Sequence, residues 1–93
     1  MRIRVRYLAV LKGLTEQPEK TVTLEGASLS DLIEMLRQTE DGPLKSRFFS
    51  SSGEVRPDLL IFINGVEHSL LGGRSAELKD DDEVTFLPSV HGG

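Results

Sequence analysis

The C-terminal stretch Leu78–Gly93, which reads LKDDDEVTFLPSVHGG, decides the fold. After an acidic turn, Glu83 to Leu87 alternates apolar and polar residues, which is typical of a strand with one buried face. Pro88 has no N–H to give to a neighbouring strand, so we expect strand pairing to fail near it. Residues 89–93 should then leave the sheet as a flexible tail that ends in two glycines.

Two strands and a helix are predicted upstream of this stretch. Residues 1–8 alternate arginines with apolar residues, and residues 21–25 alternate again, so these two strands should form a hairpin. Ser28 and Asp31 form a capping-box pattern, with Asp in place of the usual Glu. Leucine and isoleucine follow at helical spacing, which predicts a helix over residues 29–40.

The middle of the chain supplies the remaining strands. Residues 58–63 form a nearly continuous apolar run, which favours a central strand covered on both faces. Asn64-Gly65 predicts a two-residue hairpin turn, because both residues tolerate positive φ. Residues 44–57 are the least legible segment, and only a short helical turn at their two phenylalanines is expected. The order of strand, strand, helix and three strands predicts an α+β fold with the helix on one face of the sheet.

Composition limits the classes of function. Ninety-three residues make a single domain, here residues 1–88 followed by the tail of residues 89–93. The net charge of −4 argues against a general nucleic-acid binder and against adhesion to an anionic membrane. The absence of cysteine excludes disulfides, thiolate metal sites and cysteine nucleophiles. Without a signal-like or membrane-spanning apolar run, we expect a cytoplasmic protein.

The acidic turn, the Asp-Glu-Val sequence, the alternating strand, Pro88 and the final Gly-Gly together resemble the C-terminal signature of the MoaD/ThiS family. These proteins are sulfur carriers related to ubiquitin. The resemblance implies a ubiquitin-like β-grasp, a mixed sheet with one main helix packed on one face. It also implies that an E1-like adenylyltransferase, using ATP and magnesium, adenylates the carboxylate of Gly93. A sulfur donor would then convert it to a thiocarboxylate, with Gly92 giving the tail flexibility.

The resemblance leaves the acceptor of the sulfur open. The chain would be a protein co-substrate rather than an enzyme, with no bound cofactor. Its length and the long segment between the helix and the third strand are unlike the thiazole carriers, and it looks closer to the small subunit of molybdopterin synthase, whose partner is the large subunit. The Leu71-Gly72-Gly73 turn and residues 85–90 also resemble the cysteine-synthesis carriers, so these two branches stay open. The alternatives are a carrier for a cysteine-synthase-like enzyme or for tRNA thiolation, or a modifier that forms isopeptide bonds with lysines. A binding module with an inert tail is a further class.

The physical case for a Gly-Gly end is independent of the resemblance. A carboxylate activated in another protein's site must reach it on a thin stalk, and glycine has no Cβ to obstruct a close approach. That partner must also hold the carrier. If residues 61 and 63 face the helix, their neighbours form an apolar patch near the tail, unless residues 44–57 cover it. The predicted partner-binding residues are Leu60, Phe62, Leu87, Pro88, Val90 and His91.

Charged and glycine-rich segments are interpreted more conservatively. Arg2, Arg4 and Arg6 share one strand face, which could attract acidic partners but is more simply a solvated face. The acidic turn lacks the ligand spacing of a calcium loop, so no metal site is predicted. The internal Gly72-Gly73 pair predicts a turn before the last strand.

Overall fold

The computed structural model describes residues 1–89, and its sheet begins with β1 (Arg2–Tyr7). The apolar residues of β1 are fully buried, whereas the arginines between them remain accessible, as the alternation predicts. β2 (Glu19–Thr23) pairs antiparallel with β1, from Arg2 opposite Thr23 to Arg6 opposite Glu19. The connection is longer than a tight hairpin and contains the 3-10 helix η1 (Ala9–Leu14).

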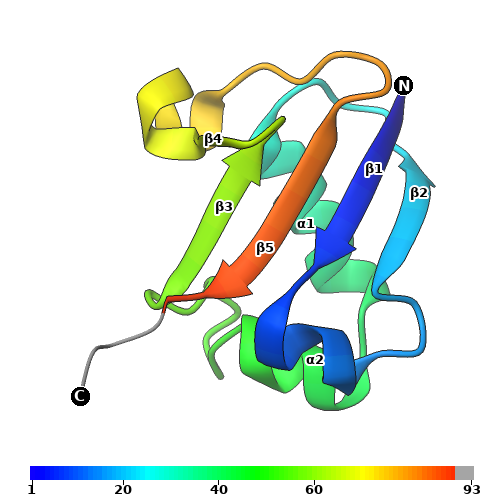
Figure 1. Cartoon of the computed structure of the whole chain (residues 1–93), viewed down its shortest axis with the longest axis vertical. Coiled ribbons are helices and arrows are strands. Elements are labelled where there is room, and N and C mark those ends of the chain that lie inside the picture. Colours follow the sequence, from blue (N-terminus) through cyan, green and yellow to red (C-terminus); the bar gives the residue numbers. More distant parts are fainter. Residues whose placement is uncertain (90–93) are drawn as a thin grey trace.

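The C-terminal strand β5 (Glu83–Pro88) lies at the centre of the sheet (Figure 1). It runs parallel to β1 and antiparallel to β3 (Leu59–Ile63). The short β4 (Val66–Glu67) pairs with β3, and the strand order is β2-β1-β5-β3-β4. Asn64 and Gly65 join β3 to β4 with φ of 49° and 80°, which confirms the predicted turn.

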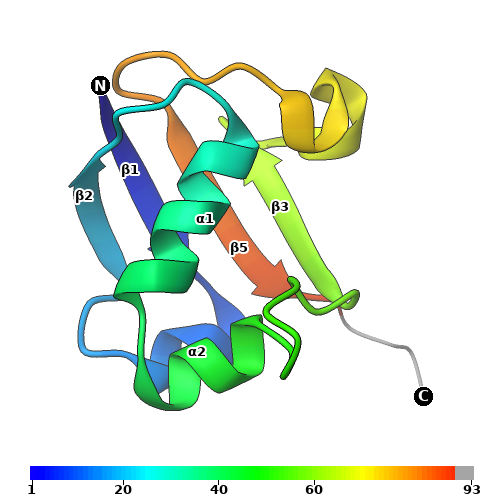
Figure 2. The ribbon, with the colours of Figure 1, turned by 180° about the vertical axis from the view of Figure 1, so that it is seen from behind.

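One face of the sheet is covered by α1 (Leu29–Thr39), as Figure 2 shows. The capping box is present: the Ser28 side chain accepts from the Asp31 backbone N–H, and the Asp31 side chain accepts from the Ser28 backbone N–H. Four apolar side chains of α1 are buried against the sheet. This is the mixed-sheet α+β layout that the sequence predicts.

Residues 44–57 contain more helix than the short turn that the sequence predicts at Phe48 and Phe49. Gly42-Pro43 starts a second helix, α2 (Gly42–Phe48), because proline is well tolerated in the first turn of a helix. The Phe48 ring lies 4.8 Å from that of Phe86 and 6.2 Å from that of Tyr7, between ring centroids. The segment therefore extends the core on the same face of the sheet as α1 and does not cover the opposite face (Figure 2).

Two short 3-10 helices, η2 (His68–Leu71) and η3 (Gly73–Ser75), fill the connection after β4. Gly72 and Gly73 have φ of 105° and 68°, so both glycines make the predicted turn in a left-handed conformation. Within residues 1–89, none of the helices combines the length and the apolar character needed to cross a membrane.

Candidate functional site

The last described residues hold the C-terminal segment to β3. Pro88 still pairs in register with Leu59, and the Ser89 backbone N–H donates to the Asp58 carbonyl oxygen at 2.7 Å. Pairing with β3 therefore continues through Pro88, because neighbouring residues of a strand direct their N–H groups to opposite sides. The Ser89 N–H faces β3, so the position of the missing Pro88 N–H faces away from it. We call Pro88 and Ser89 the tail root. The predicted roles of Val90, His91, Gly92 and Gly93 fall outside the described residues and stay predictions.

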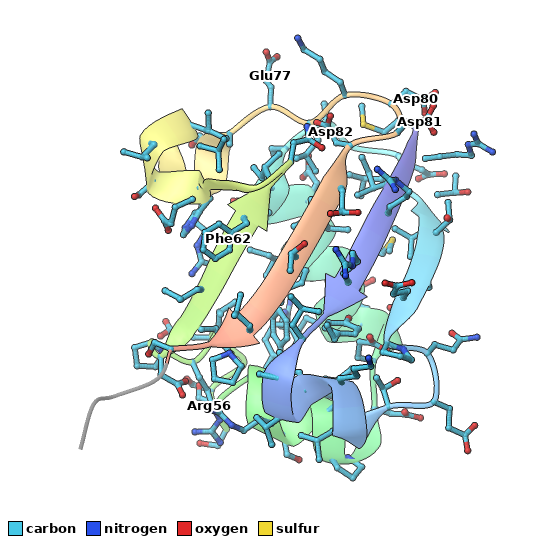
Figure 3. The ribbon with its side chains drawn as sticks, viewed as in Figure 1. Arg56, Phe62, Glu77, Asp80, Asp81 and Asp82 are labelled. Atoms are coloured by element: carbon cyan, nitrogen blue, oxygen red, sulfur yellow. The ribbon has the colours of Figure 1, made fainter. Side chains whose placement is uncertain are left out.

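The face of the sheet opposite α1 carries an apolar area beside the tail root. Leu60 and Leu87 are directly opposite each other on β3 and β5, and Phe62 is two residues along β3. All three are half-buried, whereas Ile61 and Phe86 on the other face are fully buried. Figure 3 shows Phe62 over β3 on this uncovered face. We call Leu60, Phe62 and Leu87 the outer patch.

The structure corrects one expectation about β3 and one about the patch. The prediction that residues 58–63 are covered on both faces is wrong, because α1 and α2 cover only the side of Ile61 and Ile63. Pro88 is buried, and its parity places it on the same side as Phe86. Within the described residues, the apolar area beside the tail root is therefore the outer patch alone.

The arginines of β1 form the ionic half of the same face. Arg6 lies 3.0 Å from a Glu19 carboxylate oxygen and 3.5 Å from one of Glu83. Arg4 also reaches Glu83, at 3.5 Å between nitrogen and oxygen. Because these arginines have acidic partners within the chain, they form a charge-balanced, solvated surface, the simpler of the two interpretations of the sequence.

The acidic turn stabilises the chain's own backbone. Asp80 accepts the Arg2 N–H at 2.7 Å. Asp82 accepts the Lys79 N–H at 2.8 Å and the Asn64 side-chain amide at 2.8 Å. Figure 3 shows this turn at the end of the sheet opposite the tail root. Residues 1–89 contain no group of three or more His, Asp or Glu arranged to hold a metal ion.

Sequence reasoning did not single out three exposed apolar residues that follow β3, namely Val66, Leu70 and Leu71. Leu70 is 78% exposed, the highest exposure of any large apolar residue in residues 1–89. The sequence contains an indication of this exposure. Leu70 and Leu71 directly precede the Gly72-Gly73 turn, and apart from Val66 no other apolar side chain lies within four positions of them to complete a buried face. The three residues belong to β4 and η2, at the opposite end of β3 from the tail root (Figure 1).

Comparison with known proteins gives a family match along the chain. A family model described as Urm1 (ubiquitin related modifier) matches residues 2–93. Ubiquitin-related modifier 1 of Schizosaccharomyces pombe is 31% identical over 98 residues, and the match covers 100% of both chains. The family match includes the Gly-Gly end, which lies outside the residues that the structure describes.

Several solved structures have the same fold. The small archaeal modifier protein SAMP1 from Methanosarcina acetivorans has a TM-score of 0.80 and 30% identity, covering 99% of this chain and 96% of its own. A chain in the Amycolatopsis orientalis BexX/CysO complex has a TM-score of 0.69 and 28% identity, covering 98% and 99%. A putative molybdopterin converting factor subunit 1 from Pyrococcus furiosus has a TM-score of 0.72 and 29% identity, covering 97% and 99%.

Proposed function

Since this chain belongs to the Urm1 (ubiquitin related modifier) family, we propose that it is a sulfur carrier and modifier that works through the C-terminal carboxylate of Gly93. Proteins of this ubiquitin-like family are not enzymes by themselves. The proposal therefore assigns activation and transfer to partner enzymes and gives this chain the role of the activated group's carrier. We propose that activation and transfer take place in the cytoplasm.

The proposed chemistry has two steps. In an E1-like partner, an oxygen of the Gly93 carboxylate attacks the α-phosphorus of ATP, and pyrophosphate leaves with its magnesium. The product is an acyl-adenylate, whose AMP is a much better leaving group than oxide. Hydrosulfide released by a sulfur donor then attacks the acyl carbon and displaces AMP, and loss of its proton leaves a thiocarboxylate. A lysine amine attacking the activated acyl carbon would instead give an isopeptide bond.

The observation that carries this proposal is the position of the outer patch beside the tail root. The Ser89 N–H bond to Asp58 fixes the base of the tail, and four residues follow. Four extended residues reach at most about 14 Å. A partner that binds Leu60, Phe62 and Leu87 would therefore need its active site within that distance of the tail root to receive Gly93. Half-buried apolar side chains on an uncovered sheet face suit this kind of docking.

The acceptor of the sulfur is the finer part of the proposal. The family and its relatives are described as modifiers related to ubiquitin, a description that fits a role in tRNA thiolation or in conjugation to protein lysines as well as it fits the molybdopterin branch. The molybdopterin branch has support from the likeness to the Pyrococcus furiosus structure. The cysteine branch has support from the BexX/CysO complex. We propose tRNA thiolation together with conjugation to protein lysines as the first candidate role. The small subunit of molybdopterin synthase is the second candidate.

The decisive experiment is the intact mass of the protein after incubation with its E1-like enzyme, ATP, magnesium and a sulfide source. We expect a gain equal to the exchange of one oxygen for one sulfur, localised by proteolysis to the peptide that ends in Gly93. A chain with one alanine added after Gly93 is the control and should keep its mass. An unchanged mass of the native chain, with the enzyme active on a known carrier, would overturn the sulfur-carrier proposal.

The acceptor is tested with the thiocarboxylated protein itself. Incubation with tRNA and its thiolation enzyme, with a molybdopterin synthase large subunit and its precursor, or with a cysteine-synthase-like enzyme should consume the thiocarboxylate in only one mixture. Mass spectrometry of lysine-containing proteins detects conjugation separately. Consumption only by the molybdopterin mixture would replace our first candidate with the second.

A further inference from the structure

A basic hollow lies between α2 and the loop that follows it, on the surface away from the outer patch. Its volume is about 550 Å³, and its lining includes Arg37, Lys45 and Arg56 together with Ser51 and Ser52. The chain as a whole is acidic, with a net charge of −4. The lining of this hollow is therefore positively charged, whereas the chain as a whole has a net negative charge.

Two of these cations are available to a ligand. Lys45 is exposed, and its ammonium group has no hydrogen bond or ion pair within residues 1–89. Arg56 donates from Nε to the Ser46 carbonyl oxygen at 2.9 Å, which orients the guanidinium while its terminal nitrogens have no carboxylate partner among those residues. Arg37 differs, because Glu34 accepts its Nε–H at 2.9 Å and balances its charge. Lys45 and Arg56 thus supply the unbalanced positive charge.

The backbone carbonyls of the last turn of α2 do not oppose an anion here. Phe49 N–H donates to the Lys45 carbonyl oxygen at 2.8 Å, and Arg56 N–H donates to that of Phe48 at 2.9 Å. The Ser46 carbonyl oxygen already accepts from the Arg56 side chain. The negative end of this helix is therefore satisfied by donors of the chain itself, which lowers its repulsion of a bound anion.

The loop beside the hollow is closed and presents free donors. The Ser50 N–H donates to the Glu54 carbonyl oxygen at 2.7 Å, and the Gly53 N–H donates to that of Ser50 at 2.9 Å. Gly53 has φ of 85°, which completes the turn. The backbone N–H groups of Ser51 and Ser52 make no hydrogen bond to any residue in 1–89. Successive free N–H groups next to cations are typical of anion sites.

We propose that the basic hollow binds the phosphate group of a small phosphorylated molecule, such as a nucleoside monophosphate. The Arg56 guanidinium would make the charge-assisted hydrogen bonds for which its planar geometry is suited, and Lys45 would act as a point charge. The volume is within the usual range of small-molecule sites. A long polyanion such as RNA fits less well, because the acidic remainder of the surface would repel it.

The position of the hollow links it to the carrier's working end. Arg56 is two residues before Asp58, whose carbonyl oxygen holds Ser89 at the tail root. Figure 3 shows Arg56 at the end of the molecule where β5 finishes. A bound phosphate would therefore lie beside the start of the tail. The proposal does not depend on sulfur transfer, since it concerns only side chains and backbone of the folded domain.

The test is an NMR titration of the ¹⁵N-labelled full chain with adenosine monophosphate, inorganic phosphate and adenosine. We expect saturable amide shifts at Ser51, Ser52 and Gly53 with both phosphates and none with adenosine. In K45Q/R56Q, the affinity for adenosine monophosphate should fall by at least about tenfold, as expected from losing two charge-assisted contacts. The matched control R74Q/K79Q removes the same charge from exposed sites outside the hollow and should bind normally.

Three outcomes would overturn the proposal. These are shifts that do not saturate with either phosphate, shifts of equal size with adenosine, and equal weakening in both double variants, which would indicate a general effect of net charge. Binding of a transfer RNA through Lys45 and Arg56 without binding of either small phosphate would replace it with a nucleic-acid contact. Amide spectra of the free variants check that they are folded. We expect them to be folded, because both variants carry changes only at exposed side chains.

Discussion

At the scale of single residues, Glu40 is the main polar partner in the interior. Its carboxylate accepts a hydrogen bond from the Tyr7 hydroxyl and pairs with the Lys20 ammonium at 2.9 Å. The side chains of Lys20 and Glu40 are only 18% and 12% exposed. The Lys20 ammonium also lies 5.8 Å from the centre of the Tyr7 ring. The group ties β1, β2 and the end of α1 together, although these segments are far apart in sequence.

We expect Glu40→Ala to lower the free energy of unfolding by about 1–3 kcal/mol, because it leaves the Tyr7 hydroxyl and the Lys20 ammonium without their acceptor in a partly buried site. Urea denaturation followed by circular dichroism measures this. Glu16→Ala is the control, because Glu16 is exposed and has no hydrogen bond or ion pair within residues 1–89. It should change stability by less than about 0.5 kcal/mol. Equal effects of the two changes would contradict the assigned role.

Burial, with the hydrogen bond to Glu40 and its negative charge, raises the pKa of Tyr7 far above the ordinary range. A raised pKa in the folded state means that the unfolded chain loses this proton first. The stabilising contribution is complete below about pH 10 and declines above it, by about 1.4 kcal/mol per pH unit. Tyr7→Phe should lack this alkaline decline.

The measurement is direct, because the chain has one tyrosine and no tryptophan. Phenolate absorbance should appear only as circular dichroism reports unfolding. Phenolate formation near pH 10 in a chain that keeps its native spectrum would show that Tyr7 is accessible, contrary to the structure.

At the scale of elements, the parts that sequence predicts well are those fixed by local chemistry. The Ser28–Asp31 capping box and the Asn64-Gly65 turn depend on residues within a few positions of each other, and both are present. The helix α2 is longer than the short turn that the sequence predicts at Phe48 and Phe49. Its start is not predicted because Gly42-Pro43 is a common helix terminator, whereas here it also starts the next helix. Its formation depends on the distant contact of Phe48 with Phe86, which no local pattern reveals.

The hairpin turn allows a matched test of backbone strain. Gly65 has φ of 80° and open space where a Cβ would lie, so Gly65→Ala adds strain without a clash. We expect a loss of about 1–2 kcal/mol in the free energy of unfolding. Gly13 also has open space but no positive φ, so Gly13→Ala should be neutral or stabilise by up to about 1 kcal/mol. Thermal denaturation of the pair measures the difference, and similar melting temperatures would count against the left-handed turn.

At the scale of the whole molecule, the sheet has one covered face and one uncovered face that is divided into an ionic and an apolar half. The alternation of β1, β3 and β5 predicts which residues lie on each face, and Ile61, Val84 and Phe86 are buried as expected. The position of residues 42–57 could not be predicted, because it depends on packing between distant segments. The residues of the outer patch can therefore be predicted from the sequence. Their exposure cannot, because it depends on where residues 42–57 pack.

Docking on the outer patch gives a prediction for the activation step. Phe62→Ser should raise the KM of the E1-like enzyme for this chain by about tenfold or more, because a partly exposed aromatic anchor would be lost from the interface. Val10→Ser is the control, since Val10 is 54% exposed and lies in η1, outside the patch. Steady-state adenylation kinetics measure both, and circular dichroism checks folding. A normal KM for a folded Phe62→Ser chain would show that the partner binds elsewhere.

The parallel pairing of β1 with the central β5 has a mechanical consequence. The chain starts at one end of the molecule, and β5 finishes at the other (Figure 1). A force that pulls these two ends apart slides β1 along β5, so the bonds from Arg4 to Asp82 and from Leu8 to Phe86 are loaded together. Bonds loaded together resist a pull far better than bonds opened one after another. A partner that binds the tail can therefore apply a pulling force to this chain, and we expect the domain to stay folded under that force.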